Sequence, residues 1–412
     1  MKPDDPLADS ALPPGLTRRR LIGILAFVAG LGPMAIDMYL PSLPALQQHF
    51  ASDAATTQLT LAAYFVGLAV GQLFYGSLAD ALGRRKPLLF GLTLFVLASI
   101  GCLYAPNMET LVGLRFVQAL GGCAGMVITR AIVRDCFGVA AMARVLSLLL
   151  LIMGVAPILA PLAGGYLDQW LGWQAIFAAL VAYGLTAVLL VAFGIPETMR
   201  GPRSLPSLGS ALASYQKLIR HRRFMGYALA GGIGQAGMFS YISSSSFVFI
   251  GVYGLSPQHY AWIFGANAFG LIVASQLNSI VLNRVPVQRV LRRALRAYFA
   301  FGLLLLAMAL INIGPIGLIV PLFFCIASLG FSFPNATAAA MAPFGDRAGS
   351  AAALLGTLQF TIASIASFAV GHLYNGTAVP MAAVIASCGG LALLLLTVLA
   401  GHKDRRGTTA AN

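Results

Sequence analysis

Long apolar runs separated by short polar connections dominate the pattern of this chain. A bilayer core of about 30 Å is crossed by roughly 20 helical residues, and twelve stretches approach that length. In the first half they are residues 21–40, 57–79, 87–104, 110–133, 145–166 and 173–194. In the second half they are residues 225–250, 259–282, 294–312, 315–342, 350–374 and 379–400. We therefore predict an all-α polytopic membrane protein with twelve transmembrane helices.

The longest polar stretch between two spans lies in the middle of the chain. Residues 195–224 contain three prolines, one glutamate and six basic residues, and they divide the spans into six and six. We predict a tail over residues 1–20, a bundle over 21–194, a linker over 195–224, a second bundle over 225–400 and a tail over 401–412. Two six-helix bundles of this kind typically rock about a central site.

Composition excludes a soluble protein and explains the charge. Apolar residues make up 59% of the chain and charged residues 9%, whereas soluble domains carry about 25% charged residues. A net charge of +14 would suggest nucleic acid in a soluble protein. However, 24 of the 26 basic residues fall on one side when alternate connections are assigned to opposite sides. By the positive-inside rule, we predict cytoplasmic termini and no nucleic-acid partner.

The cysteines and the first span argue against two further possibilities, a disulfide or metal site and a cleaved signal peptide. The five cysteines lie in spans or at a span end, so they indicate packing rather than a disulfide framework or a metal site. The first span continues for about twenty residues without the usual small-residue cleavage site, so we expect a retained helix rather than a signal peptide.

One carboxylate, that of Asp37, lies within a predicted span, and the other eleven lie in tails or at span ends. A charge at that depth costs about 2.5–3.5 kcal/mol, which makes it a functional candidate. At about 1.5 Å per residue, Asp37 lies about 24 Å from Leu21, and Arg115 lies about 28 Å from Arg134. The two can therefore meet if their helices are neighbours. We predict that Asp37 carries the proton and that Arg115 modulates it.

Two other interpretations of Asp37 remain open from the residues alone. It could form a permanent ion pair with Arg115 that locks two helices together. It could also lie in the outer headgroup region, since Pro41 follows only four residues later.

A glycine- and charge-rich segment follows the second span, with the sequence Gly76-Ser-Leu-Ala-Asp80-Ala-Leu-Gly83-Arg84-Arg85-Lys86. Gly76 permits close helix approach, Gly83 a tight turn, and Asp80 can accept backbone amides at a helix N-terminus. The segment resembles the cytoplasmic signature of the major facilitator superfamily, in which an acid at the inner end of the fourth helix pairs with the arginine. That resemblance implies a conformational latch made of six residues, which are Gly76, Asp80, Gly83, Arg84, Arg85 and Asp135.

Two further segments refine this resemblance. Arg115-Phe-Val-Gln118 is similar to the buried-arginine motif of the superfamily. The antiporter signature is matched by Pro157, Pro161, Gly164 and Gly165, with Ala160 where glycine is usual. Close helix packing alone is the other explanation of that motif.

Segments 36–44 and 237–242 resemble the bicyclomycin-resistance/CflA family of drug:proton antiporters. The resemblance implies a major facilitator transporter in a bacterial inner membrane, and we expect it to be a monomer. It implies export of small drugs of the bicyclomycin and chloramphenicol type by proton antiport.

Candidate substrate-binding residues lie at mid-span depth, where an apolar cavity with a few polar groups is expected. They are Met34, Asp37, Met126, Met153, Phe239, Tyr241, Asn267, Gln359 and Phe360. Flexible methionines suit a promiscuous surface, although each Met or Phe taken singly also fits ordinary packing.

The mechanism expected from these features needs no cofactor. No G-x-x-x-x-G-K loop occurs, so we expect the proton gradient rather than ATP to drive transport. With one deep carboxylate, about one proton per cycle and a preference for neutral drugs over dications are expected. A proton-coupled importer of a metabolite or sugar on the same fold is the alternative. A membrane enzyme is not expected, because the five histidines form no catalytic or metal-binding cluster at one depth.

Overall fold

The computed structural model describes residues 16–199, 208–344 and 348–400, and every regular element in these ranges is helical. Within the ranges, the side chains of residues 139, 140, 143, 144, 147, 150–153, 208–213 and 348 are outside the description. The predicted tails over 1–15 and 401–412 also lie outside the described residues.

Twelve long helices form the described part of the chain and lie close to the predicted spans. The first six are α1 (Arg18–Asp37), α3 (Ala54–Leu82), α4 (Arg85–Leu103), α5 (Met108–Cys136), α6 (Val139–Leu171) and α7 (Gln174–Gly194). The second six are α9 (Arg222–Ser246), α10 (Pro257–Val281), α11 (Val287–Leu310), α12 (Pro315–Met341), α13 (Ala348–His372) and α14 (Val379–Leu395). The prediction of an all-α, twelve-helix architecture is confirmed.

Shorter elements complete the long helices. A turn at Leu40–Ser42 and helix α2 (Leu43–His49) follow α1. The π-helical segments Phe247–Val252 and Leu396–Ala400 extend α9 and α14. Helix α8 (Leu208–Arg220) lies within the predicted linker, so this stretch contains a helix of its own.

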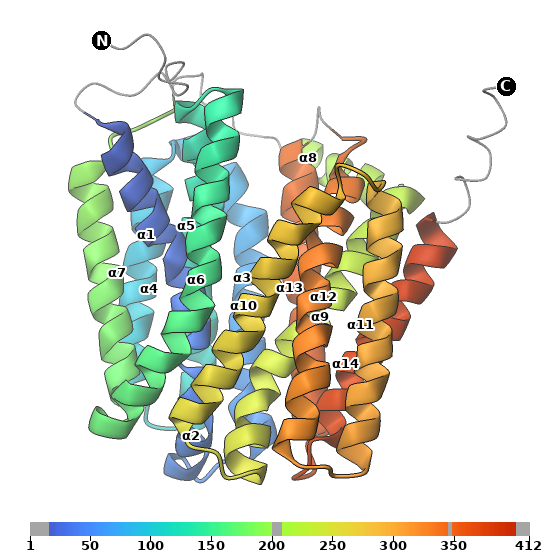
Figure 1. Cartoon of the computed structure of the whole chain (residues 1–412). Helices are drawn as coiled ribbons and strands as arrows, with labels where there is room; N and C mark the ends of the chain where they lie inside the picture. The colour runs from blue at the N-terminus through green and yellow to red at the C-terminus, as the bar shows by residue number, and fades with distance from the viewer. Residues whose placement is uncertain (1–15, 200–207, 345–347, 401–412) are drawn as a thin grey trace, which may run out of the picture.

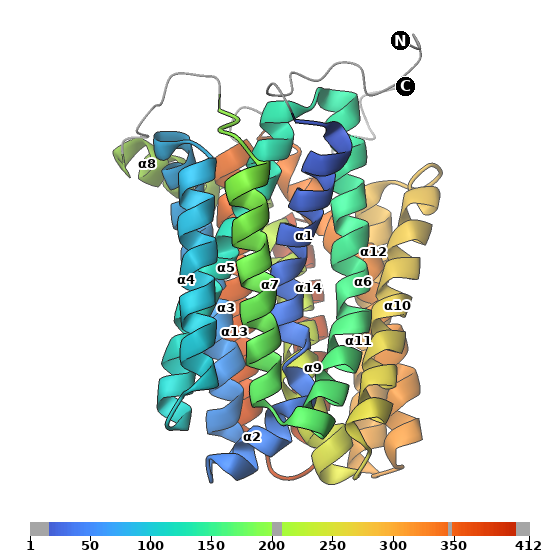
Figure 2. The same ribbon diagram turned by 90° about the vertical axis from the view of Figure 1, so that its left-hand side faces the viewer.

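The two halves of the chain lie side by side, blue to green and yellow to red in Figure 1. Within the first half α5 packs against α3 and α4, and α1 packs against α5, α6 and α7. Within the second half α12 packs against α9, α10 and α11. The halves meet mainly where α3 packs against α13 and α6 against α10. We call the end where α1 begins and α9 begins the basic end, and the opposite end, which carries α2 in Figure 2, the far end.

Apolar side chains cover the outer surface of both halves. Phe90, Leu97, Phe193, Trp262 and Ile316 are all exposed, on α4, α7, α10 and α12. Among the described residues, ten helical stretches are long and apolar enough to cross a membrane. Helices of this length with an apolar outer surface are typical of a protein surrounded by lipid.

Proline and capping residues determine where several helices begin and end. The side chains of Asp53, Asn107 and Ser256 accept amide hydrogen bonds at the starts of α3, α5 and α10. Pro41 lacks the N–H that would bond the carbonyl of Asp37, and its ring would clash with that carbonyl in a continuing helix. Helix α1 therefore ends at Asp37.

Candidate transport site

Asp37 is the last residue of α1 and lies inside the protein. Asp37 is 4% exposed, so it does not lie on the outer surface of the protein. The turn Leu40–Ser42, which follows Asp37, packs against α6 of the first half and against α9 and α10 of the second. The end of α1 that carries Asp37 is thus close to residues of both halves.

Arg115 of α5 is fully buried and is held by groups that carry no formal charge. Its Nη2 donates to the backbone carbonyl of Ala35 at 3.0 Å, and its Nη1 donates to Oε1 of Gln118 at 2.5 Å. The guanidinium carbon lies 4.7 Å from the ring centroid of Tyr39 and 4.3 Å from that of Tyr64. These distances are those of cation–π contacts.

The contact with Ala35 has an electrostatic reason. Ala35 lies in the last turn of α1, where carbonyls lack helical partners and the helix dipole is negative. Arg115 therefore stabilises the broken end of α1, two residues before Asp37.

The structure does not pair the two predicted charges. No salt bridge joins Asp37 and Arg115 among the salt bridges of the described residues. The interpretation of a permanent ion pair is therefore wrong for this conformation. Their depths agree as expected, but the guanidinium faces the α1 backbone and two aromatic rings rather than the carboxylate.

Gly164 in the antiporter motif lies against the same end of α1. A Cβ on Gly164 would lie 1.8 Å from the carbonyl oxygen of Met38, the residue after Asp37. Only a residue without a side chain lets α6 approach this backbone. The motif thus has a specific contact beside Asp37.

The rest of the antiporter motif lies between α1 and the second half. Pro157 and Pro161 are inside α6, and Ala160 between them is buried. The position of a Cβ on Gly165 is 3.5 Å from the carbonyl of Pro257, at the start of α10. Near this point Gln258 donates to Gln169 across the two halves. The far ends of the bundles are therefore in contact.

At the basic end, Arg84 is held between two carboxylates. Its Nε donates to Oδ2 of Asp135 at 2.7 Å, and its Nη1 donates to Oδ1 of Asp80 at 2.6 Å. The structure thus brings together three of the six predicted latch residues. Arg85 extends away from them and donates to the carbonyl of Ala192 at the end of α7.

Glu197, just beyond α7, has a role that sequence reasoning missed. Its carboxylate accepts the amides of Arg84 at 2.9 Å and Arg85 at 3.3 Å, at the start of α4. We assigned amide binding to Asp80, and this is wrong because Asp80 bonds the Arg84 side chain instead. Partial burial opposes ionisation, but these amides and those of residues 198 and 199 hold the pKa of Glu197 below its usual 4.5.

The two latch glycines differ. Gly83 has a φ of +87°, and a Cβ there would lie 2.3 Å from Oε2 of Glu197. Gly83 is therefore required both for the turn and for the approach of Glu197. A Cβ on Gly76 would have no atom within 4 Å, so the expectation that Gly76 permits close helix approach is wrong.

The predicted substrate residues form two groups rather than one cavity. The ring centroids of Phe239 and Phe360 lie 5.9 Å apart, and both rings contact Phe65 of α3. Separately, Asn267 donates to the hydroxyl of Tyr241 at 2.9 Å, and the Oδ1 of Asn267 is buried without a partner.

The other predicted substrate residues are more dispersed. Met126 faces Gly32 of α1, and Gln359 faces Gly232 of α9. Met34 packs partly buried in the core. The side chain of Met153 is outside the description.

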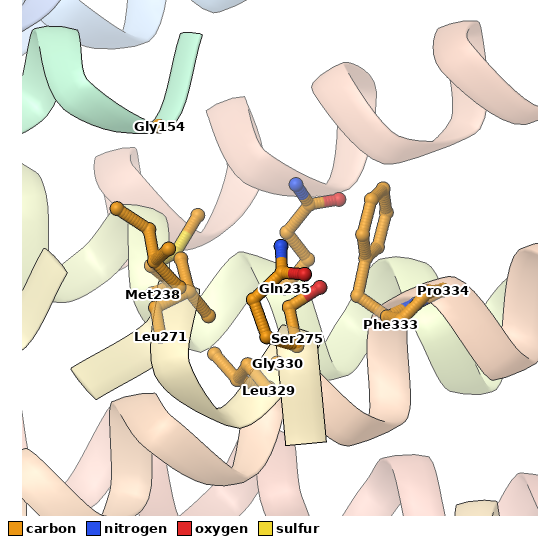
Figure 3. A pocket seen from close by; sticks show the side chains of 11 residues that line it. Gly154, Gln235, Met238, Leu271, Ser275, Leu329, Gly330, Phe333 and Pro334 are labelled. Carbon is orange, nitrogen blue, oxygen red and sulfur yellow. The ribbon is translucent and has the colours of Figure 1, made fainter. Parts of the chain in front are cut away.

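A cavity of about 360 Å³ lies elsewhere, between α6, α9, α10 and α12. Figure 3 shows Gln235, Met238, Ser275 and Phe333 directed toward it. The full lining is Gly154, Gln235, Met238, Leu271, Ile272, Ser275, Gln276, Leu329, Gly330, Phe333 and Pro334. None of the predicted substrate residues is among them.

The volume and the mixed lining of this cavity are those of a small-molecule site. The missed residues did carry a signal, because Gln235, Ser275 and Gln276 are polar side chains within spans. The Oε1 of Gln235 is buried without a partner and is available to a ligand.

Comparison with known proteins decides the family. The family model described as Major Facilitator Superfamily matches residues 25–368. The chain belongs to the major facilitator superfamily. It is a multi-pass membrane protein with the family and fold of transporters, and the recognition made from its motifs is confirmed.

Several relatives are similar over nearly the whole chain. The uncharacterized MFS-type transporter YdgK of Bacillus subtilis is 39% identical, covering 93% of this chain and 97% of the relative. The bicyclomycin resistance protein homolog of Haemophilus influenzae is 31% identical, covering 90% and 93%. The chloramphenicol resistance protein of Pseudomonas aeruginosa is 30% identical, covering 89% and 86%.

A solved structure supports the fold. The D-xylose-proton symporter superposes with a TM-score of 0.74 over 92% of this chain and 97% of that chain, at 14% identity. At this identity the likeness shows the major facilitator fold alone.

Proposed function

We propose that this transporter exports small drugs in exchange for protons and that Asp37 carries the proton. The observation that supports this most strongly is a buried carboxylate at a broken helix end with no ion-pair partner among the described residues. Its relatives named for bicyclomycin and chloramphenicol resistance support the substrate class.

The position of Asp37 suits a carboxylate whose access changes during transport. Keeping an unpaired carboxylate charged inside the protein is costly, so the protonated form is favoured while the site is closed to water. When the site opens to water, hydration stabilises the charged form, so the proton can leave. Arg115 keeps the end of α1 in place without neutralising Asp37 permanently.

The two ends of the molecule supply the alternating access. The basic end faces the cytoplasm in this proposal, following the positive-inside rule, in a bacterial inner membrane. With the far ends in contact at Gln169 and Gln258, a drug enters the cavity beside Gln235 from the cytoplasm. Proton loading of Asp37 on the opposite side then returns the emptied transporter.

Two roles follow for the glycine and latch residues. Gly164 carries any movement of α6 directly to the backbone beside Asp37. The cluster of Arg84, Asp80 and Asp135 joins α3, α4 and α5 at the basic end. The strength of these ion pairs can therefore affect how readily the basic end closes.

Proteoliposomes that contain a pH-sensitive dye test the proposal. Chloramphenicol should evoke proton release in the wild type and none in Asp37→Asn. The matched control is Asp53→Asn, because asparagine caps a helix as well as aspartate does, so its proton signal should stay within about twofold.

Each remaining outcome is informative. Equal proton movement in wild type and Asp37→Asn would contradict the role of Asp37. A wild type that moves no proton with any antibiotic would contradict drug antiport. Uptake of a sugar or metabolite with protons would then favour the symporter alternative.

A further inference from the structure

Arg130 of α5 is a second arginine within the fourth span, and it has a different environment from Arg115. Its side chain is exposed, whereas that of Arg115 is fully buried. The direction in which Arg130 projects from α5 therefore decides whether it meets lipid or the inside of the protein.

The contacts of α5 show which way Arg130 points. Gly121 and Ala124 face Gly91 of α4, at the periphery of the first half. At about 100° per residue, Arg130 lies about 150° around the helix from that side.

The remaining contacts place Arg130 between two other helices. The side chain of Met126, one turn earlier, faces Gly32 of α1, and that of Cys123, two turns earlier, faces Gly71 of α3. Arg130 lies between these two directions. Because α3 packs against α13 of the second half, this direction leads to the space between the two halves.

No carboxylate neutralises Arg130 among the described residues. The acids near the basic end are engaged elsewhere, since Asp80 and Asp135 bond Arg84 and Glu197 accepts backbone amides. Asp37 lies near the level of Arg115. Arg130 is 15 helical residues further along α5, which places it about 22 Å from that level. A guanidinium without a counter-charge is an anion-binding group.

From this placement, and resting on the proposed function, we propose that Arg130 binds the carboxylate of anionic or zwitterionic drugs as they enter from the basic end. The guanidinium can hold a carboxylate by two parallel hydrogen bonds. The same charge repels cationic drugs. The transporter therefore accepts neutral and anionic amphiphiles and discriminates against cations.

Binding to the purified full-length protein tests this with two probes of different charge. Radiolabelled nalidixate carries one carboxylate, and radiolabelled chloramphenicol is neutral. Arg130→Gln should weaken nalidixate binding at least tenfold and chloramphenicol binding less than twofold. Arg130→Lys, which keeps the charge, should retain nalidixate binding within about fivefold and should also fold if Arg130→Gln does not.

Arg134→Gln is the matched control, because it removes the same charge one turn further along α5. Its side chain is 59% exposed and lies 4.0 Å from Asp135, so binding of both probes should be unchanged. Failure of the wild type to bind nalidixate overturns the inference, as does an equal loss of both probes in Arg130→Gln. The proton signal with chloramphenicol reports the proposed function separately, so the two can fail independently.

Discussion

Two buried arginines, Arg84 and Arg115, anchor opposite ends of the first bundle by different means. Arg84 is 4% exposed and lies between two carboxylates at 2.6 and 2.7 Å. Arg115 is fully buried and contacts a backbone carbonyl, an amide and two tyrosine rings. The charge of Arg84 is matched by acids, whereas that of Arg115 is not.

This difference distinguishes a fixed connection at Arg84 from the proposed proton site beside Arg115. The two carboxylates that bond Arg84 join it to α3 and α5, which suits a latch. At Arg115, neutral groups hold the cation, so Asp37 has no ion-pair partner among the described residues. Positioning a charge without neutralising its neighbour is what a proton-coupled site requires.

The largest expected effect comes from the backbone contact beside Asp37. Gly164→Ala would place a Cβ 1.8 Å from the Met38 carbonyl, and a backbone cannot move aside cheaply. We expect a loss of about 2–3 kcal/mol in unfolding free energy and loss of export.

Gly76→Ala is the control for that change, because its Cβ would meet no atom within 4 Å. Its unfolding free energy should change by less than about 0.5 kcal/mol. Thermal unfolding in detergent and a drug-efflux assay measure both variants. Equal tolerance of the two substitutions would contradict the assigned contact.

Arg115→Lys tests whether Arg115 needs its neutral hydrogen-bond and ring partners or only its charge. A lysine keeps the charge but cannot bond the Ala35 carbonyl and Gln118 while stacking between Tyr39 and Tyr64. We expect drug-evoked proton release to fall at least tenfold, with the protein still folded. Arg115→Lys with wild-type proton release would show that charge alone is sufficient.

Glu197→Gln tests the support beneath the latch. Because the pKa of Glu197 is lowered on folding, its stabilisation is present above pH 4.5 and is lost as pH falls through the folded pKa. At pH 7 we expect Glu197→Gln to cost about 1 kcal/mol, given partial exposure.

Below about pH 4.5 the difference between Glu197→Gln and wild type should shrink. Unfolding measured from pH 7 to pH 3 checks this slope. Glu109→Gln is the control, since Glu109 is exposed in the first turn of α5 and should change stability by a few tenths of a kcal/mol. A difference that grows with acidification would contradict the role of Glu197.

Much of this architecture follows from local physics in the sequence. Bilayer thickness determines span length, so all twelve long helices could be predicted, and Pro41 explains why α1 ends at Asp37. The equal depth of Asp37 and Arg115 could be predicted from counting residues. Whether the two side chains turn toward each other could not, because direction depends on the packing of α1, α3 and α5.

The missed features depend on contacts between distant segments. Glu197 meets the Arg84 amide 113 residues away, and a carboxylate that binds backbone leaves no partner side chain to recognise. The cavity beside Gln235 arises where α6 of one half meets α9, α10 and α12 of the other. Span boundaries carry no information about how the halves are set against each other, so the predicted substrate residues missed it.

The smallest expected effect is the loss of Asp80 from the latch. Asp80 is 45% exposed and Asp135 is 17% exposed, so solvent screens the Arg84–Asp80 pair more strongly. Double-mutant cycles with Arg84→Gln should give about 0–0.5 kcal/mol for Asp80→Asn and about 1 kcal/mol or more for Asp135→Asn. A third cycle with Arg134→Gln and Asp135→Asn should give almost none, because that pair is 4.0 Å apart and Arg134 is exposed. If the Asp80 pair proved stronger than the Asp135 pair, exposure would not decide which acid holds Arg84, and the contrast with Arg115 would depend on geometry alone.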